Sequence, residues 1–108
     1  MASKKDEVIK MINQFLDRVR QHHDVRSAYL FGSFAKGIDK DYSDVDLAIV
    51  LGSKEITAGS PFDEHFRIFH EAQKFNSLLE VVCLDQDEFD RNGGALVQRI
   101  KKEGIRII

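Results

Sequence analysis

The stretch that decides the fold runs from Tyr29 to Val50 and reads YLFGSFAKGIDKDYSDVDLAIV. One apolar segment ends at the pair Gly32-Ser33, and a second begins at two aspartates, Asp44 and Asp46. Apolar runs bounded by turn residues predict two buried strands joined by a polar connection. Carboxylates this close together repel one another unless a cation or hydrogen-bond donors lie nearby. The sequence therefore predicts a candidate functional site at this connection.

Outward from this stretch, predicted strands alternate with predicted helices. Helix starts are expected at Ser3, Ser60-Pro61 and Asp85, where side chains suited to helix N-termini precede periodic apolar residues. The expected strands cover residues 25–31, 45–51, 78–84 and 105–108, and the last helix covers residues 95–102. This order predicts an α/β (α+β) fold, with helices packed on a small sheet.

The helix that follows Pro61 is predicted to bury a stripe of apolar side chains. The stripe consists of Phe62, Phe66, Phe69 and Ala72. The four histidines show no metal-ligand spacing, and His22 and His23 are expected at a solvated helix end.

Length and composition limit the functions available. The 108 residues are expected to form one domain, residues 1–108, and 43% hydrophobic with 31% charged residues is ordinary for a globular protein. The net charge of −2 provides no overall basic field, so a nucleic-acid partner is not expected. The single cysteine, Cys83, is expected to be a buried thiol. No apolar segment approaches membrane-spanning length, which predicts a cytoplasmic protein and no membrane partner.

The pattern Asp-x-Asp occurs three times, and its context separates the three. Asp39/Asp41 is typical of a solvated turn, and Asp85/Asp87 of a helix start. Only Asp44/Asp46 runs directly into an apolar strand, where residues two apart point to the same face. Two adjacent carboxylates suit Mg²⁺, which takes one or two carboxylates together with substrate phosphates. The alternative is a strand that merely begins in solvent.

The Gly-Ser pair favours the magnesium interpretation. Gly32 allows a phosphate to approach the backbone closely, and the Ser33 hydroxyl and the exposed amides can donate to phosphate oxygens. Lys36 adds a positive charge on the same loop. An ordinary polar turn is the alternative. A phosphate-binding loop next to a carboxylate pair is what a nucleotide–Mg²⁺ site requires.

The residues Gly32-Ser33, ten intervening residues and Asp44-Val45-Asp46 resemble the signature of the DNA polymerase β-like nucleotidyltransferase superfamily. GSFAKG followed by SDVDL is similar to its minimal nucleotidyltransferase branch, and the likeness extends to a closing KKEGI element, Lys101 to Ile105. The resemblance implies a nucleotidyltransferase fold with a mixed sheet, a Gly-Ser turn that binds the triphosphate, and Mg²⁺ on Asp44 and Asp46.

That superfamily uses a third carboxylate on a neighbouring strand. Glu80 is the only acidic residue inside the third predicted strand, where the family pattern favours aspartate. The resemblance implies that Glu80 helps to bind a second metal ion or accepts a proton from the acceptor hydroxyl. Glu80 on an exposed strand face remains the alternative.

The leading hypothesis is an enzyme that moves a nucleoside monophosphate, AMP from ATP, to a hydroxyl. Because the predicted catalytic core uses almost the whole chain, another polypeptide is expected to shape the acceptor site. The resemblance implies a small helical HEPN-type toxin, silenced by adenylylation of a tyrosine, with this protein as its antitoxin. A non-catalytic module that neutralises its partner by binding is the main alternative. Nucleotidylation of a small molecule such as an aminoglycoside is a weaker one, and a polymerase role is weaker still.

Overall fold

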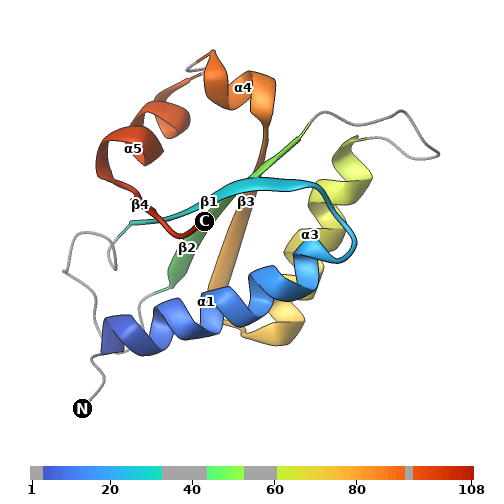
Figure 1. Ribbon diagram of the computed structural model, residues 1–108, viewed down its shortest axis with the longest axis vertical. Helices are drawn as coiled ribbons and strands as arrows, with labels where there is room; N and C mark the ends of the chain where they lie inside the picture. Colours follow the sequence, from blue (N-terminus) through green and yellow to red (C-terminus); the bar gives the residue numbers. More distant parts are fainter. Residues whose placement is uncertain (1–3, 33–43, 53–60, 92–93) are drawn as a thin grey trace.

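A mixed sheet of four strands, in the spatial order β3-β2-β1-β4, organises the described part of the chain (Figure 1). The computed structural model describes residues 4–32, 44–52, 61–91 and 94–108. Strand β1 is antiparallel to both β2 and β4, whereas β2 is parallel to β3. The strands are β1 (Val25–Phe31), β2 (Val45–Leu51), β3 (Leu79–Asp85) and β4 (Ile105–Arg106).

Helices pack on both faces of this sheet. They are α1 (Lys4–Arg20), α3 (Pro61–Phe75), α4 (Gln86–Asp90) and α5 (Ala95–Glu103). Figure 1 shows α1 and α3 together on one side of the strands, apart from α4 and α5. Helix α3 lies in the connection between the parallel strands β2 and β3. Such a connection must be long, because it has to return the chain to the end of the sheet where β2 began. The predicted fold class, a mixed sheet with packed helices, is confirmed.

Two apolar layers bury the central strand β2 on both faces. On one face, Leu47 and Ile49 pack with Phe15 of α1 and Ile68 of α3. On the other, Ala48 and Val50 pack with side chains of the shorter helices, namely Phe89, Val97 and Ile100. Residues 47–50 are fully buried. The expectation of a strand covered on both sides is therefore confirmed, and α5 lies over the face to which Asp46 belongs by alternation.

The predicted buried stripe of α3 is only partly right, because Ala72 is buried but two of the predicted rings are not. Phe66 and Phe69 are 63% and 40% exposed, whereas Ile68 and Ala72 are fully buried. Ile68 and Ala72 are four residues apart and share the face that packs on the sheet, whereas Phe66 lies on the opposite side of the helix and Phe69 lies at the border of the buried face. Phe62 lies outside the side chains that the structure describes.

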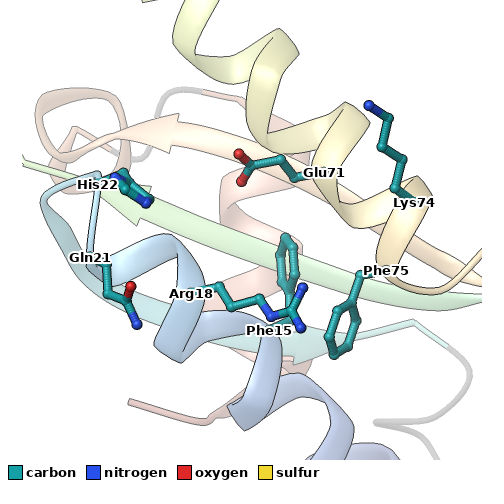
Figure 2. A pocket seen from close by; sticks show the side chains of 7 residues that line it. All are labelled: Phe15, Arg18, Gln21, His22, Glu71, Lys74 and Phe75. Atoms are coloured by element: carbon teal, nitrogen blue, oxygen red, sulfur yellow. The ribbon is translucent and has the colours of Figure 1, made fainter.

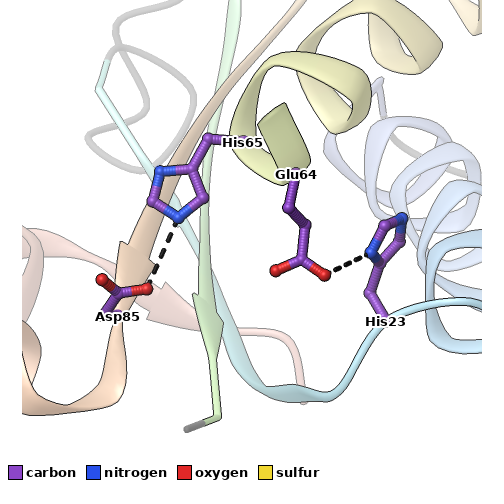
Figure 3. Close-up of polar contacts among 4 residues, drawn as sticks. All are labelled: His23, Glu64, His65 and Asp85. Carbon is purple, nitrogen blue, oxygen red and sulfur yellow. Dashed lines mark hydrogen bonds and ion pairs between the residues drawn. The ribbon is translucent and has the colours of Figure 1, made fainter. Parts of the chain in front are cut away.

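The structure corrects three smaller predictions. Asp85 is the N-cap residue of α4, but its side chain makes no capping hydrogen bond; its Oδ1 lies 3.5 Å from His65 Nε2 instead (Figure 3). His23 is largely buried rather than solvated, and its Nδ1 donates to Glu64 Oε2 at 2.7 Å. Cys83 is only partly buried, at the edge of the larger apolar layer. Among the described helices, none is long and apolar enough to cross a membrane.

Candidate functional site

Asp46 and Glu80 are direct neighbours across the parallel pair β2/β3. Their Cα atoms are register partners, and the preceding pair in the ladder is Val45 with Leu79. Since side chains alternate along a strand, both carboxyl groups share the face that carries Ala48. The structure therefore brings together two of the predicted site residues that are 34 positions apart in the sequence.

Asp44 completes a group of three interacting carboxyl groups. It is exposed and immediately precedes β2, two residues before Asp46. Burial raises the pKa of Asp46, and the negative charge of Asp44 raises it further. The Glu80 side chain is exposed, yet partial desolvation of its carboxyl group raises its pKa, followed by the charges of Asp44 and Asp46 and by hydrogen bonds to both side chains. The hydrogen bond to Glu80 and the positive charge of Arg99 act in the opposite direction and lower the pKa of Asp46.

Gly32 lies directly against the carboxylate of Asp46. It follows the end of β1, where Phe31 pairs with Asp46, and it has a φ of +77°. A Cβ atom at Gly32 would lie 2.1 Å from Asp46 Oδ2, a separation that no side chain can tolerate. Glycine is therefore required here by backbone conformation and by space. Gly32 and Asp46, which belong to separate motifs in the sequence, meet at this point.

The remaining predicted residues of the phosphate-binding loop, Ser33 and Lys36, lie outside the described residues. The aspartates of the solvated-turn motif, Asp39 and Asp41, do so as well. Their predicted roles remain predictions.

One basic residue near the carboxylates was not predicted from the sequence. The positive charge of Arg99, on α5, lowers the pKa of Asp46, and its Nε donates to Glu103 Oε2 at 3.4 Å. Arg99 lies between Val97 and Ile100, which pack against the sheet face that carries Asp46. In the sequence, Arg99 is one of several basic residues on an amphipathic helix, so only the packing of α5 identifies it.

The donor set suits a magnesium ion completed by a ligand rather than a closed protein site. Within the described residues, no group of three or more His, Cys, Asp or Glu side chains is arranged to hold a metal by itself. The pKa values of Asp46 and Glu80 are nevertheless raised, first by desolvation and then by the neighbouring negative charges. Mg²⁺ is typically held by one or two carboxylates plus substrate phosphates, and its charge would relieve this repulsion.

The raised pKa values predict a pH-dependent stability difference between the wild type and Asp46→Asn. In the folded protein, the pKa values of Asp46 and Glu80 are higher than their ordinary values of 3.8 and 4.5, which apply in the unfolded chain. Both groups therefore bind protons more tightly when the protein is folded. The folded state is therefore destabilised by these two carboxylates when both are ionised, at higher pH. This destabilisation is lost as the pH falls through the raised pKa values and the groups are protonated. Without metal, Asp46→Asn should melt above the wild type near pH 7, and this gain should shrink toward about pH 4.

Thermal melts across this pH range measure the difference. Asp17→Asn, an exposed position on α1 on the other side of the sheet, removes the same formal charge and serves as the control. A gain in melting temperature that is equal in both variants would show a general charge effect instead of repulsion at the site.

A glycine after one strand, carboxylates at the start of the next and a carboxylate on its parallel neighbour thus come together at the same end of the sheet. The family model described as polymerase beta, nucleotidyltransferase, matches residues 11–108. The chain therefore belongs to the polymerase beta nucleotidyltransferase family. Among curated proteins, none matches the sequence.

Solved structures share the fold at low sequence identity. A protein from Sulfolobus solfataricus, assigned as a nucleotidyltransferase, is 20% identical with a TM-score of 0.58, covering 94% of this chain and 80% of the other. A toxin-antitoxin structure with AMP-PNP is 16% identical with a TM-score of 0.55, covering 98% of this chain and 73% of the other. A mutant of the toxin-antitoxin MntA-HpeT is 14% identical with a TM-score of 0.52, over 98% and 73% of the two chains.

Proposed function

We propose that this protein transfers AMP from ATP to a hydroxyl group of a protein partner, a tyrosine of a helical HEPN-type toxin, and thereby acts as its antitoxin. The observation that carries the transferase part is the meeting of Gly32, Asp46 and Glu80 at one edge of the sheet. Membership of the nucleotidyltransferase family supports the same reaction class. The structural neighbour crystallised with AMP-PNP, an analogue of ATP, supports the choice of nucleotide.

Each residue has a defined task in this proposal. The loop from Gly32 through Ser33 and Lys36 holds the triphosphate, because glycine lets the phosphate approach the backbone. Asp44 and Asp46 hold Mg²⁺, with Glu80 as a ligand of a second ion or as the proton acceptor. The bound metal ion supplies positive charge where negative charge develops on the phosphate oxygens.

The transfer step itself is a substitution at phosphorus. The acceptor hydroxyl oxygen forms a bond to the α-phosphorus, and the bond to the bridging oxygen of the leaving pyrophosphate breaks. The hydroxyl proton passes to Glu80. Its raised pKa suits this task, because proton acceptors work best when their pKa lies closer to the working pH. Positioning and electrostatics supply most of the acceleration in such transfers.

Glu80→Gln tests the role of the third carboxylate. We expect transfer to fall on the order of a hundredfold, the usual effect of losing a proton acceptor, while nucleotide binding stays close to that of the wild type. Glu80→Asp should retain part of the activity, because it keeps the charge with a shorter reach. Single-turnover transfer rates and calorimetric ATP–Mg²⁺ titrations separate the two effects. Full activity in Glu80→Gln would remove Glu80 from the mechanism.

Neutralisation of the partner by binding alone is the second candidate function. The exposed rings of Phe66 and Phe69 on α3 offer a surface for a protein partner, since large apolar side chains gathered on a surface often mark protein interfaces. Both rings contact His70 edge-on, with centroids 4.3 and 6.2 Å away. A protein partner is common to both candidates, so these rings do not distinguish them.

The deciding experiment incubates the protein with ATP, Mg²⁺ and the product of the adjacent reading frame, and then weighs both proteins by mass spectrometry. The proposal expects the partner to gain the mass of one AMP group, lost when its acceptor tyrosine is changed to phenylalanine. A stable complex whose partner gains no mass, and which Asp46→Asn leaves intact, would establish the binding-only function instead.

A further inference from the structure

A pocket between α1 and α3 lies on the sheet face opposite to Asp46 and Glu80. Its volume is about 350 Å³, within the range of small-molecule sites. Figure 2 shows its seven lining residues, which come from the second half of α1, the two residues that follow it and the end of α3. They are Phe15, Arg18, Gln21, His22, Glu71, Lys74 and Phe75.

Two contacts hold the walls of this pocket together. The rings of Phe15 on α1 and Phe75 on α3 lie with their centroids 5.6 Å apart. Nearby, the 2.7 Å hydrogen bond from His23, just after α1, to Glu64 of α3 joins the same two segments (Figure 3). A pocket whose walls are fixed before a ligand arrives costs less ordering entropy on binding.

The polar groups at the pocket are suited to an anion. Arg18 lies over the Phe75 ring at 5.0 Å from its centroid, which holds the guanidinium in place while its N–H groups stay available. Lys74 adds a second positive charge, against a single carboxylate, that of Glu71. In the described part of the chain, neither Lys74 nor Glu71 forms an ion pair.

We propose that this pocket binds a small organic anion that carries a flat ring and a hydrogen-bond donor. The carboxylate or phosphate of the ligand accepts from Arg18, whose fixed guanidinium fork favours such planar or tetrahedral oxyanions, and Lys74 adds positive charge at the rim of the pocket. The ring packs at the Phe15/Phe75 floor, and Glu71 accepts from the donor of the ligand. Because the pocket lies across the sheet from the carboxylate site, its occupant does not compete with nucleotide.

Nuclear magnetic resonance titrations with 4-hydroxybenzoate and with phenyl phosphate test the proposal, and they show which oxyanion is preferred. Saturable shifts are expected at Arg18, Lys74 and Phe75, with a Kd of about 1 mM or lower for at least one probe. The neutral analogue 4-hydroxybenzamide should bind at least about tenfold more weakly than 4-hydroxybenzoate if the carboxylate is the preferred group.

Variants separate this site from the surface in general and from the nucleotide site. Arg18→Gln and Lys74→Gln should each weaken binding about tenfold or more, whereas Lys102→Gln on α5 and Asp46→Asn should leave it unchanged. Wild-type affinity in both Arg18→Gln and Lys74→Gln would overturn the proposal. So would the absence of saturable shifts up to about 10 mM, or shifts centred on Gly32 and Asp46.

Discussion

Asp46→Asn should abolish nucleotide transfer, with a loss on the order of a thousandfold or more, while the fold stays intact. Asp46 faces Glu80 across β2/β3 and Gly32 at the end of β1, so it occupies the centre of the proposed site. Asparagine has nearly the same shape but removes the anion that would hold Mg²⁺ against the triphosphate. Asp44→Asn should have an effect in the same direction.

The measurement combines a transfer assay with two structural controls. Circular dichroism and thermal melts of Asp46→Asn should match or exceed those of the wild type, because burial and like charge oppose ionisation of Asp46. Mg²⁺ should raise the melting temperature of the wild type and leave that of the variant nearly unchanged. Asp87→Asn, at the exposed start of α4, is the matched control and should keep full activity. Full activity in Asp46→Asn would refute the assignment.

Gly32→Val should eliminate ATP–Mg²⁺ binding, and Gly32→Ala should weaken it severely. The first added carbon already overlaps Asp46 Oδ2, and the φ of +77° costs any side chain on the order of 1 kcal/mol. Relief of the overlap must move either the turn or the Asp46 carboxylate, and both belong to the proposed nucleotide site. Calorimetric titration with ATP and Mg²⁺ measures the loss.

Gly94→Ala separates backbone strain from the collision. Gly94 has a φ of +125°, but a Cβ atom there would have no described atom within 4 Å other than those of its neighbours in the chain. It should therefore lose stability and keep nucleotide binding, whereas Gly32→Ala should lose both. Equal loss of binding in the two variants would trace the effect to general destabilisation. Ser33→Ala, on the same loop as Gly32, should weaken triphosphate binding to a smaller degree.

Local patterns in the sequence were enough to predict most of the framework. The strand over 25–31 has the predicted bounds, and the apolar run after Asp46 forms the strand buried on both faces. The strand with Glu80 runs from Leu79 to Asp85, one residue later than predicted. The alternation of side chains still places Glu80 beside Asp46, because a parallel pair fixes the register for the whole strand.

Features that depend on packing between elements could not be predicted in this way. Phe66 and Phe69 are as apolar as Ile68, so composition alone did not show which side of α3 faces the sheet. The effect of Arg99 on Asp46 depends on where α5 crosses the sheet. The burial of His23 depends on Glu64, a partner 41 positions away. Long-range contacts of this kind leave no local periodicity to detect.

The parallel pairing of β2 with β3 also determines when in folding the proposed site can exist. Asp46 and Glu80 become neighbours only after α3 has crossed over and the two strands have joined, a contact of long range in the chain. A partly folded or newly made chain carries the Gly-Ser turn and the aspartates but lacks their third carboxylate. Such a chain can bring neither the full negative charge nor the proton acceptor to a nucleotide. The proposed site is therefore assembled only once β2 and β3 have paired.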